Sequence, residues 1–142
     1  MSIIQISVFM EDKTGKLASI AKLIGEKGVN IFGFDVADTA EGYGIFRLIT
    51  QDPDKSAEIL AQNGYTVSKN EVLCVFLENK PAQLAKALKI LADNGIGIEY
   101  IYAIVESLIV MKVDSMQAAR KALEENGIRV LNMQDLLSHV QG

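Results

Sequence analysis

The sequence predicts the α+β fold class, in the form of two copies of one small module joined in tandem. The main observation is an internal repeat, because the residues that begin at Val8 recur sixty-seven positions later, beginning at Val75. A second observation is that strand-like and helix-like patterns follow one another in the same order in both copies. Between Val8 and Ile31, nine positions carry the same residue at that offset: Val8/Val75, Phe9/Phe76, Glu11/Glu78, Lys13/Lys80, Leu17/Leu84, Ala18/Ala85, Lys22/Lys89, Gly28/Gly95 and Ile31/Ile98.

In the first copy, residues 4–9 alternate between apolar and polar positions with the two-residue period of a half-buried strand. A polar turn follows, and apolar residues then recur at helical spacing until Gly28, a residue type that commonly ends helices. Asp52-Pro53 is typical of a helix start, with a capping residue followed by proline. We therefore expect further strands over residues 29–37, 43–50 and 65–68, and helices over residues 17–28 and 53–64.

The second copy predicts the same order, from a strand over residues 72–77 to a last strand over residues 128–131. Its helices are expected to open at Pro81 and after Ser115, and its hairpin strands cover residues 96–105 and 107–113. The order β-α-β-β-α-β is the ferredoxin-like arrangement, with an antiparallel sheet and both helices on one face. We expect domains over residues 1–70 and 71–142, a joint at residues 69–71, and an extra helical turn over residues 135–140.

The composition and charge argue against several classes of protein. A net charge of −4 and a pI near 5.0 disfavour a nucleic-acid binder, which usually has a basic surface. The N-terminal residues lack a secretory pattern, and no apolar run reaches the ~18 residues of a membrane span. The expectation is a cytoplasmic protein that binds neither nucleic acid nor membrane.

The sequence also lacks the residue sets that catalysis requires. The one histidine, His139, stands alone near the C-terminus and is expected at the surface, and the one cysteine, Cys74, lies inside an apolar strand. Neither metal-ligand spacing nor a phosphate-binding loop is present in the sequence. We therefore expect no catalytic residue, no metal and no cofactor.

The residues of the first turn resemble the ACT domain family. Its opening pattern Asp-x-x-Gly-x-Leu is present as Asp12, Gly15 and Leu17, and its Gly-Val-Asn-Ile is present at residues 28–31. The tandem arrangement resembles stand-alone double-ACT proteins, and the resemblance covers essentially the whole chain. It implies two ferredoxin-like ACT modules paired into a pseudo-dimer, with a regulatory function and an amino acid as the ligand.

The resemblance places the ligand between the first-turn loop of one ACT unit and the start of the second strand of its neighbour. Independently, Gly15 permits close approach of the backbone, and the N–H groups of the first helical turn can bind an α-carboxylate. Asp12 or Asn30 could hold the α-ammonium group. The candidate ligand-binding residues are Asp12, Lys13, Thr14, Gly15, Leu17, Asn30, Ile31, Asn79, Gly97 and Ile98.

The two copies differ at this turn, where the second copy has Asn79 for Asp12, Ala82 for Gly15 and Gly97 for Asn30. If one ligand binds per chain, we expect it at the loop of the first copy. Two structural alternatives stay open: Asp12 can simply cap the helix, and Gly15 can simply form the turn.

Other features bear on partners. Residues 98–105 are apolar at both strand parities, which indicates that both faces need cover and favours a homodimer. Arg47 and Asp35 are expected to form a cross-strand pair. The main alternative to an amino-acid sensor is an assembly or regulatory subunit of an enzyme of amino-acid metabolism that has no ligand site of its own.

Overall fold

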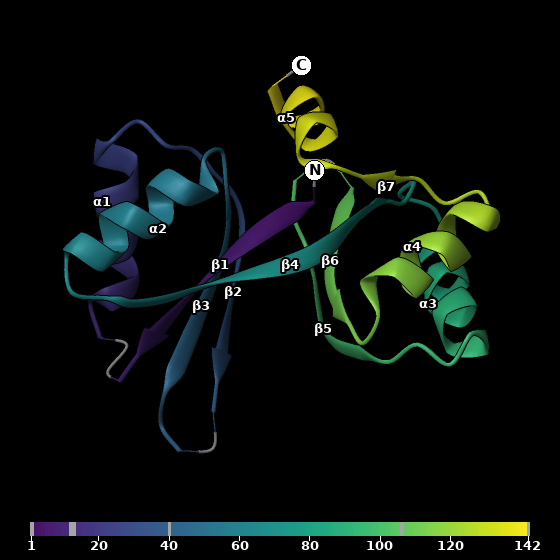
Figure 1. The fold of residues 1–142 in the computed structure, drawn as a ribbon, viewed down its shortest axis with the longest axis horizontal. Helices are drawn as coiled ribbons and strands as arrows, with labels where there is room; N and C mark the ends of the chain where they lie inside the picture. Colours follow the sequence, from purple (N-terminus) through teal and green to yellow (C-terminus); the bar gives the residue numbers. More distant parts are fainter. Residues whose placement is uncertain (1, 12–13, 40, 106, 142) are drawn as a thin grey trace. The chain divides into compact units, whose positions relative to one another are not determined.

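The computed structural model describes residues 2–11, 14–39, 41–105 and 107–141, and it divides the chain into two compact units. One unit spans Ile4–Asn70, and the other consists of Glu71–Gly142 with the first residues of the chain. Each unit contains antiparallel strands and two helices that cover one face of its sheet (Figure 1). The predicted α+β class with two β-α-β-β-α-β modules is confirmed.

The first unit has the strand order β2-β3-β1-β4. Its core lies between the sheet and the two helices, where Ile6 and Val8 of the first strand meet Ile20, Ile24 and Leu60 of the helices. All five of these side chains are fully buried. The elements are β1 (Ile3–Met10), α1 (Lys16–Glu26), β2 (Ile31–Asp38), β3 (Gly44–Thr50), α2 (Pro53–Gln62) and β4 (Thr66–Phe76).

The face of this sheet opposite the core carries a polar row. Arg47 of β3 lies directly across from Asp35 of β2, and its Nη1 donates a hydrogen bond of 2.7 Å to the Asp35 Oδ2. On the other side of Arg47, Ser7 of β1 donates from its hydroxyl to Asn70 Oδ1 over 2.6 Å. The predicted cross-strand pair of Asp35 and Arg47 is therefore confirmed.

The second unit has the strand order β5-β6-β4-β7. Leu73 and Val75 of β4 pack against Leu91 and Leu123, which lie on the two helices that cover this sheet, and all four side chains are fully buried. The elements after β4 are α3 (Gln83–Asp93), β5 (Ile98–Ala103), β6 (Leu108–Val113), α4 (Met116–Glu125), β7 (Val130–Leu131) and α5 (Met133–Gln141).

The chain divides between Asn70 and Glu71, inside the stretch expected as the joint at residues 69–71, but that stretch is not a loop. Those residues lie inside β4, which continues as one strand from Thr66 to Phe76. The run Ser68-Lys69-Asn70-Glu71 is too polar to be predicted as a strand from hydrophobic periodicity. Backbone pairing with β1 and the Ser7–Asn70 hydrogen bond nevertheless keep it extended.

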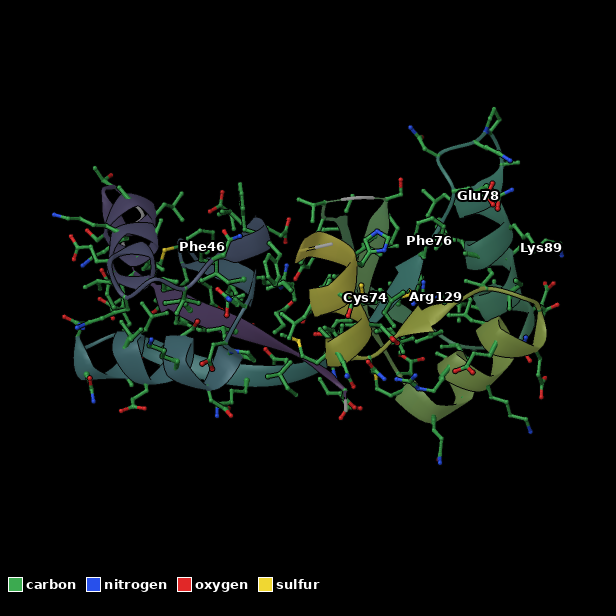
Figure 2. All side chains as sticks on the ribbon, turned by 90° about the horizontal axis from the view of Figure 1, so that it is seen from above. Phe46, Cys74, Phe76, Glu78, Lys89 and Arg129 are labelled. Atoms are coloured by element: carbon green, nitrogen blue, oxygen red, sulfur yellow. The ribbon has the colours of Figure 1, made fainter. Side chains whose placement is uncertain are left out.

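Helix α5 is longer than the predicted helical turn over residues 135–140. It packs on the face of the second unit's sheet opposite α3 and α4. The His139 ring lies 5.6 Å from the Phe76 ring, and Figure 2 shows Phe76 next to α5. Because Val75 belongs to the core under α3 and α4, its neighbour Phe76 points to the opposite face. His139, which was expected at the surface, is only partly exposed, and its ring lies against Phe76.

Candidate functional site

The turns that precede the first helix of each copy share one backbone geometry. Gly15 has φ 76° and precedes α1, and Ala82 has φ 71° and precedes α3. The hydrogen bonds correspond as well, since Ser19 N donates to Gly15 O over 3.1 Å and Lys86 N donates to Ala82 O over 3.0 Å. The second copy therefore keeps the shape of the turn without the glycine, although a left-handed alanine costs roughly 1–2 kcal/mol.

This turn also moves the start of the second copy's helix. The sequence predicted that Pro81 opens the helix, but α3 begins at Gln83. The prediction was wrong because it treated proline as the first helical residue, whereas the chain first takes a left-handed residue at Ala82.

The predicted site residues of the first turn are only partly described. Asp12 and Lys13 lie outside the described residues. Thr14 and Gly15 are exposed, whereas Leu17 packs against the core of its unit and so anchors the start of α1. Apart from Gly15 and its two chain neighbours, no described residue has a heavy atom within 4 Å of the position that a Gly15 Cβ would occupy, so the backbone is open to approach there.

The other predicted residues of the first copy, Asn30 and Ile31, lie at the opposite end of the unit. Ile31 pairs with Thr50, whereas Met10, which leads into the turn, pairs with Gly44 six residues away along β3. At the usual rise of a strand this separation is about 20 Å. Turn and strand opening therefore do not meet within a single unit.

At this opposite end, both copies hold the start of the second strand with the same pair of bonds. Asn30 N donates to the Gln51 side-chain oxygen over 3.2 Å, and Gln51 N donates back to Asn30 O over 2.9 Å. Gly97 N donates to Asp114 Oδ2 over 2.7 Å, and Asp114 N donates to Gly97 O over 3.1 Å. Gly97 and Ile98 thus lie in a structural clamp that corresponds to the one at Asn30 and Ile31.

The hydrogen bonds between Gly97 and Asp114 explain why the second copy has a glycine at position 97. A Cβ at Gly97 would lie 2.7 Å from Asp114 Oδ2, so Gly97→Ala must displace this carboxylate and weaken its hydrogen bond. We expect a loss of about 1 kcal/mol of unfolding free energy in urea unfolding. In an Asp114→Ala background the same substitution should cost much less, and an equal cost in both backgrounds would show that the displaced carboxylate is not the cause. Gly25→Ala, with open space around its Cβ, is the control.

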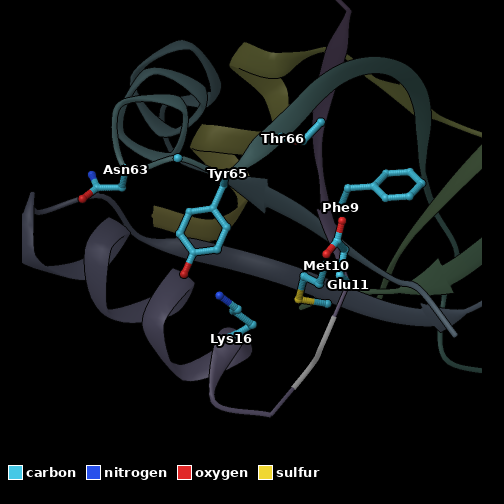
Figure 3. Close-up of a pocket in the computed structure, with 8 residues that line it drawn as sticks. Phe9, Met10, Glu11, Lys16, Asn63, Tyr65 and Thr66 are labelled. Carbon is cyan, nitrogen blue, oxygen red and sulfur yellow. The ribbon is translucent and has the colours of Figure 1, made fainter.

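A hollow of about 500 Å³ adjoins the first turn within the first unit. It lies where the end of β1 and the start of α1 meet the connection from α2 to β4 (Figure 3). The Lys16 ammonium lies 5.8 Å from the centroid of the Tyr65 ring, inside the range of a cation–π contact. The lining residues are Phe9, Met10, Glu11, Lys16, Asn63, Gly64, Tyr65 and Thr66.

Among the predicted site residues that the structure describes, none lines this hollow. Glu11, Lys16 and Tyr65 were not predicted, because neither the family motif nor the strand opening includes them. The signal was present in the predicted topology, which brings the end of the second helix beside the first turn. It was also present in the comparison of the copies, since Lys16 corresponds to Gln83 and Tyr65 to Ile128.

The second unit has a smaller hollow of about 300 Å³ at its own turn, and predicted residue Asn79 is among those that line it. Two of its lining residues form an ion pair, with Lys80 Nζ 2.7 Å from Glu78 Oε2. The side-chain hydrogen bond, and then the opposite charge, lower the pKa of Glu78 and raise the pKa of Lys80. Glu78 is thus already neutralised by a neighbour.

Two features that often carry chemistry can be assessed among the described residues, namely metal-binding clusters and reactive thiols. Within the described ranges there is no group of three or more His, Cys, Asp or Glu side chains that could hold a metal ion. Burial raises the pKa of the Cys74 thiol to about 12, so it is not a nucleophile at neutral pH. Among the helices described, none combines the length and the apolar character that crossing a membrane requires.

Comparisons with known proteins agree with the repeat and the fold. A family model described as an ACT domain pair matches residues 1–140. A crystal structure of a Bacteroides thetaiotaomicron protein is similar at 30% identity, with 96% of each chain covered and a TM-score of 0.89. The search of curated proteins found no match.

More distant structures share the fold. The regulatory subunit of aspartate kinase from Thermus thermophilus, in its ligand-free form, is 17% identical over 89% of this chain and 94% of its own, with a TM-score of 0.62. The corresponding subunit from Thermus flavus is also 17% identical, over 88% and 92% of the two chains, with a TM-score of 0.58. At this identity the likeness establishes the fold alone.

Proposed function

Because the chain belongs to the ACT domain pair family, we propose that it is a non-catalytic regulatory protein that binds a small ligand, an amino acid. The observation that carries this proposal is the family match over residues 1–140. Further support comes from the likeness to a subunit described as the regulatory subunit of aspartate kinase. By analogy, the partner of this chain would be an enzyme of amino-acid metabolism.

The first turn is the place we propose for the ligand. Gly15 leaves open space beside the backbone, and helix α1 begins immediately after it. The N–H groups of a first helical turn attract a carboxylate. The sequence-predicted residues Asp12, Lys13, Thr14, Asn30, Ile31, Asn79, Gly97 and Ile98 stay predictions, as does completion of the site by a second ACT unit.

Regulation would follow from unequal affinity of the ligand for two arrangements of the protein. A ligand can shift an equilibrium only by the difference between its affinities for the two states. We propose that the protein acts as a homodimer in the cytoplasm, so that ligand binding changes how it engages the enzyme it regulates.

Thermal unfolding with each of the twenty L-amino acids at millimolar concentration tests the proposal. A ligand at one hundred times its Kd stabilises the folded state by about 2.7 kcal/mol. For a chain of this size, a Tm increase of several degrees is expected with one or a few amino acids. Sodium chloride at the same concentration controls for ionic strength. If no amino acid raises the Tm, the assembly subunit without a ligand site becomes the better interpretation.

A further inference from the structure

We propose that the hollow of the first unit binds the charged head of an α-amino acid, with the Lys16 ammonium on the α-carboxylate and the Glu11 carboxylate on the α-ammonium. This inference rests on the function proposed above and names the side chains that would hold the ligand. It places recognition within one unit, on β1, the start of α1 and the connection between α2 and β4.

The size and the lining of the hollow suit such a ligand. Its volume of about 500 Å³ lies within the range of small-molecule sites. Two opposite charges, Glu11 and Lys16, line one hollow together with the apolar surfaces of Phe9, Met10 and Tyr65. Opposite charges beside apolar surface match a zwitterion that carries an uncharged side chain.

The Lys16 ammonium contacts an aromatic ring but no carboxylate among the described residues. Its contact is with the face of the Tyr65 ring, at 5.8 Å, and it forms no ion pair with any described residue. Figure 3 shows Lys16 reaching from the start of α1 toward Tyr65, with the Glu11 carboxylate on the far side of Met10 in this view. Within the described part of the chain, Glu11 likewise has no ion-pair partner. Both charges are therefore available to a ligand.

The second copy lacks the pair of unneutralised charges found at Glu11 and Lys16. Glu78 corresponds to Glu11, but Lys80 binds it at 2.7 Å. Gln83 replaces Lys16, so the second copy has no cation at that position. Lys13, which corresponds to Lys80, lies outside the described residues. The combination of an available anion and an aromatic-supported cation is a feature of the first unit.

Paired variants test the assignment. For the L-amino acid that gives the largest Tm increase, titration calorimetry should show Kd raised about 10–100-fold by Lys16→Met and by Glu11→Gln. The matched controls are Lys22→Met, on the exposed side of the same helix, and Glu78→Gln, at the corresponding position of the second copy. Both controls should bind as the unsubstituted protein does.

Ligand derivatives provide a second arm that does not depend on the variants. The N-acetyl form of the same amino acid lacks the ammonium charge, and its carboxamide lacks the carboxylate charge. If the site binds both the α-carboxylate and the α-ammonium, each derivative should bind at least about 10-fold more weakly than the amino acid itself. The carboxamide should also lose its sensitivity to Lys16→Met, and the N-acetyl form its sensitivity to Glu11→Gln.

The outcomes separate this inference from the proposed function. Unchanged Kd values for Lys16→Met and Glu11→Gln, with binding intact, would overturn the assignment and leave the regulatory function standing. A loss of binding in Asn30→Ala but in neither of the two variants would place the ligand at the strand opening instead. Absence of binding by all twenty amino acids would overturn both.

Discussion

Replacing Leu91 with alanine is expected to lower the free energy of unfolding by about 2–5 kcal/mol, and Ile24→Ala by a similar amount. The two residues correspond in the repeat, and each is fully buried between a helix and the sheet of its own unit. Truncation removes buried methyl and methylene groups and leaves a cavity that the surrounding side chains fill only in part. Urea unfolding monitored by circular dichroism measures both losses.

Exposed residues on the same helices provide matched controls. Lys22 and Lys89 also correspond in the repeat, and they form ion pairs with Glu26 and Asp93 at 3.6 and 2.8 Å. Because these pairs are exposed, Lys22→Ala and Lys89→Ala should each cost less than about 1 kcal/mol. If Leu91→Ala or Ile24→Ala were as mild as its control, that core would not be the source of stability in its unit.

The glycines at helix ends explain why the fold was predictable from the sequence. Gly28, Gly64, Gly95 and Gly127 all have positive φ, the backbone conformation for which glycine is favoured at such positions. A repeat that carries these glycines and the same apolar spacing in both copies limits the fold to two equivalent modules. Local sequence chemistry was therefore sufficient for the number, order and type of the main elements.

What the sequence left undetermined depends on contacts between distant residues. The polar run that includes Asn70 is held as a strand by β1, more than sixty residues earlier, and no local pattern shows this. The hollow next to Lys16 likewise requires Tyr65, which periodicity marks only as the start of a short strand. A hollow lined by three separate elements cannot be predicted from one motif, whereas the family pattern predicts Asp12 and Asn30, which stay predictions.

Alkaline pH is expected to destabilise the protein through Cys74. Burial raises the pKa of this thiol from 9.0 to about 12, because the thiolate cannot be solvated between the neighbouring strands that carry Val110 and Leu131. Between these two pKa values the unfolded chain loses the proton while the folded chain keeps it, so the unfolded state binds fewer protons. The thiol's contribution to stability is therefore complete below about pH 9, and between the two pKa values it falls by about 1.4 kcal/mol per pH unit.

Comparison with Cys74→Ala isolates this contribution from the lysines and tyrosines that titrate in the same range. The alanine variant loses some packing at every pH, but the difference between the two proteins should shrink as the pH rises from 9.0 toward 12 and then reverse in sign. Urea unfolding at a series of pH values measures it. Parallel stability curves would mean that the folded protein accommodates the thiolate.

The same burial predicts that a thiol reagent labels Cys74 in the unfolded chain far faster than in the native one, because only the accessible thiolate reacts.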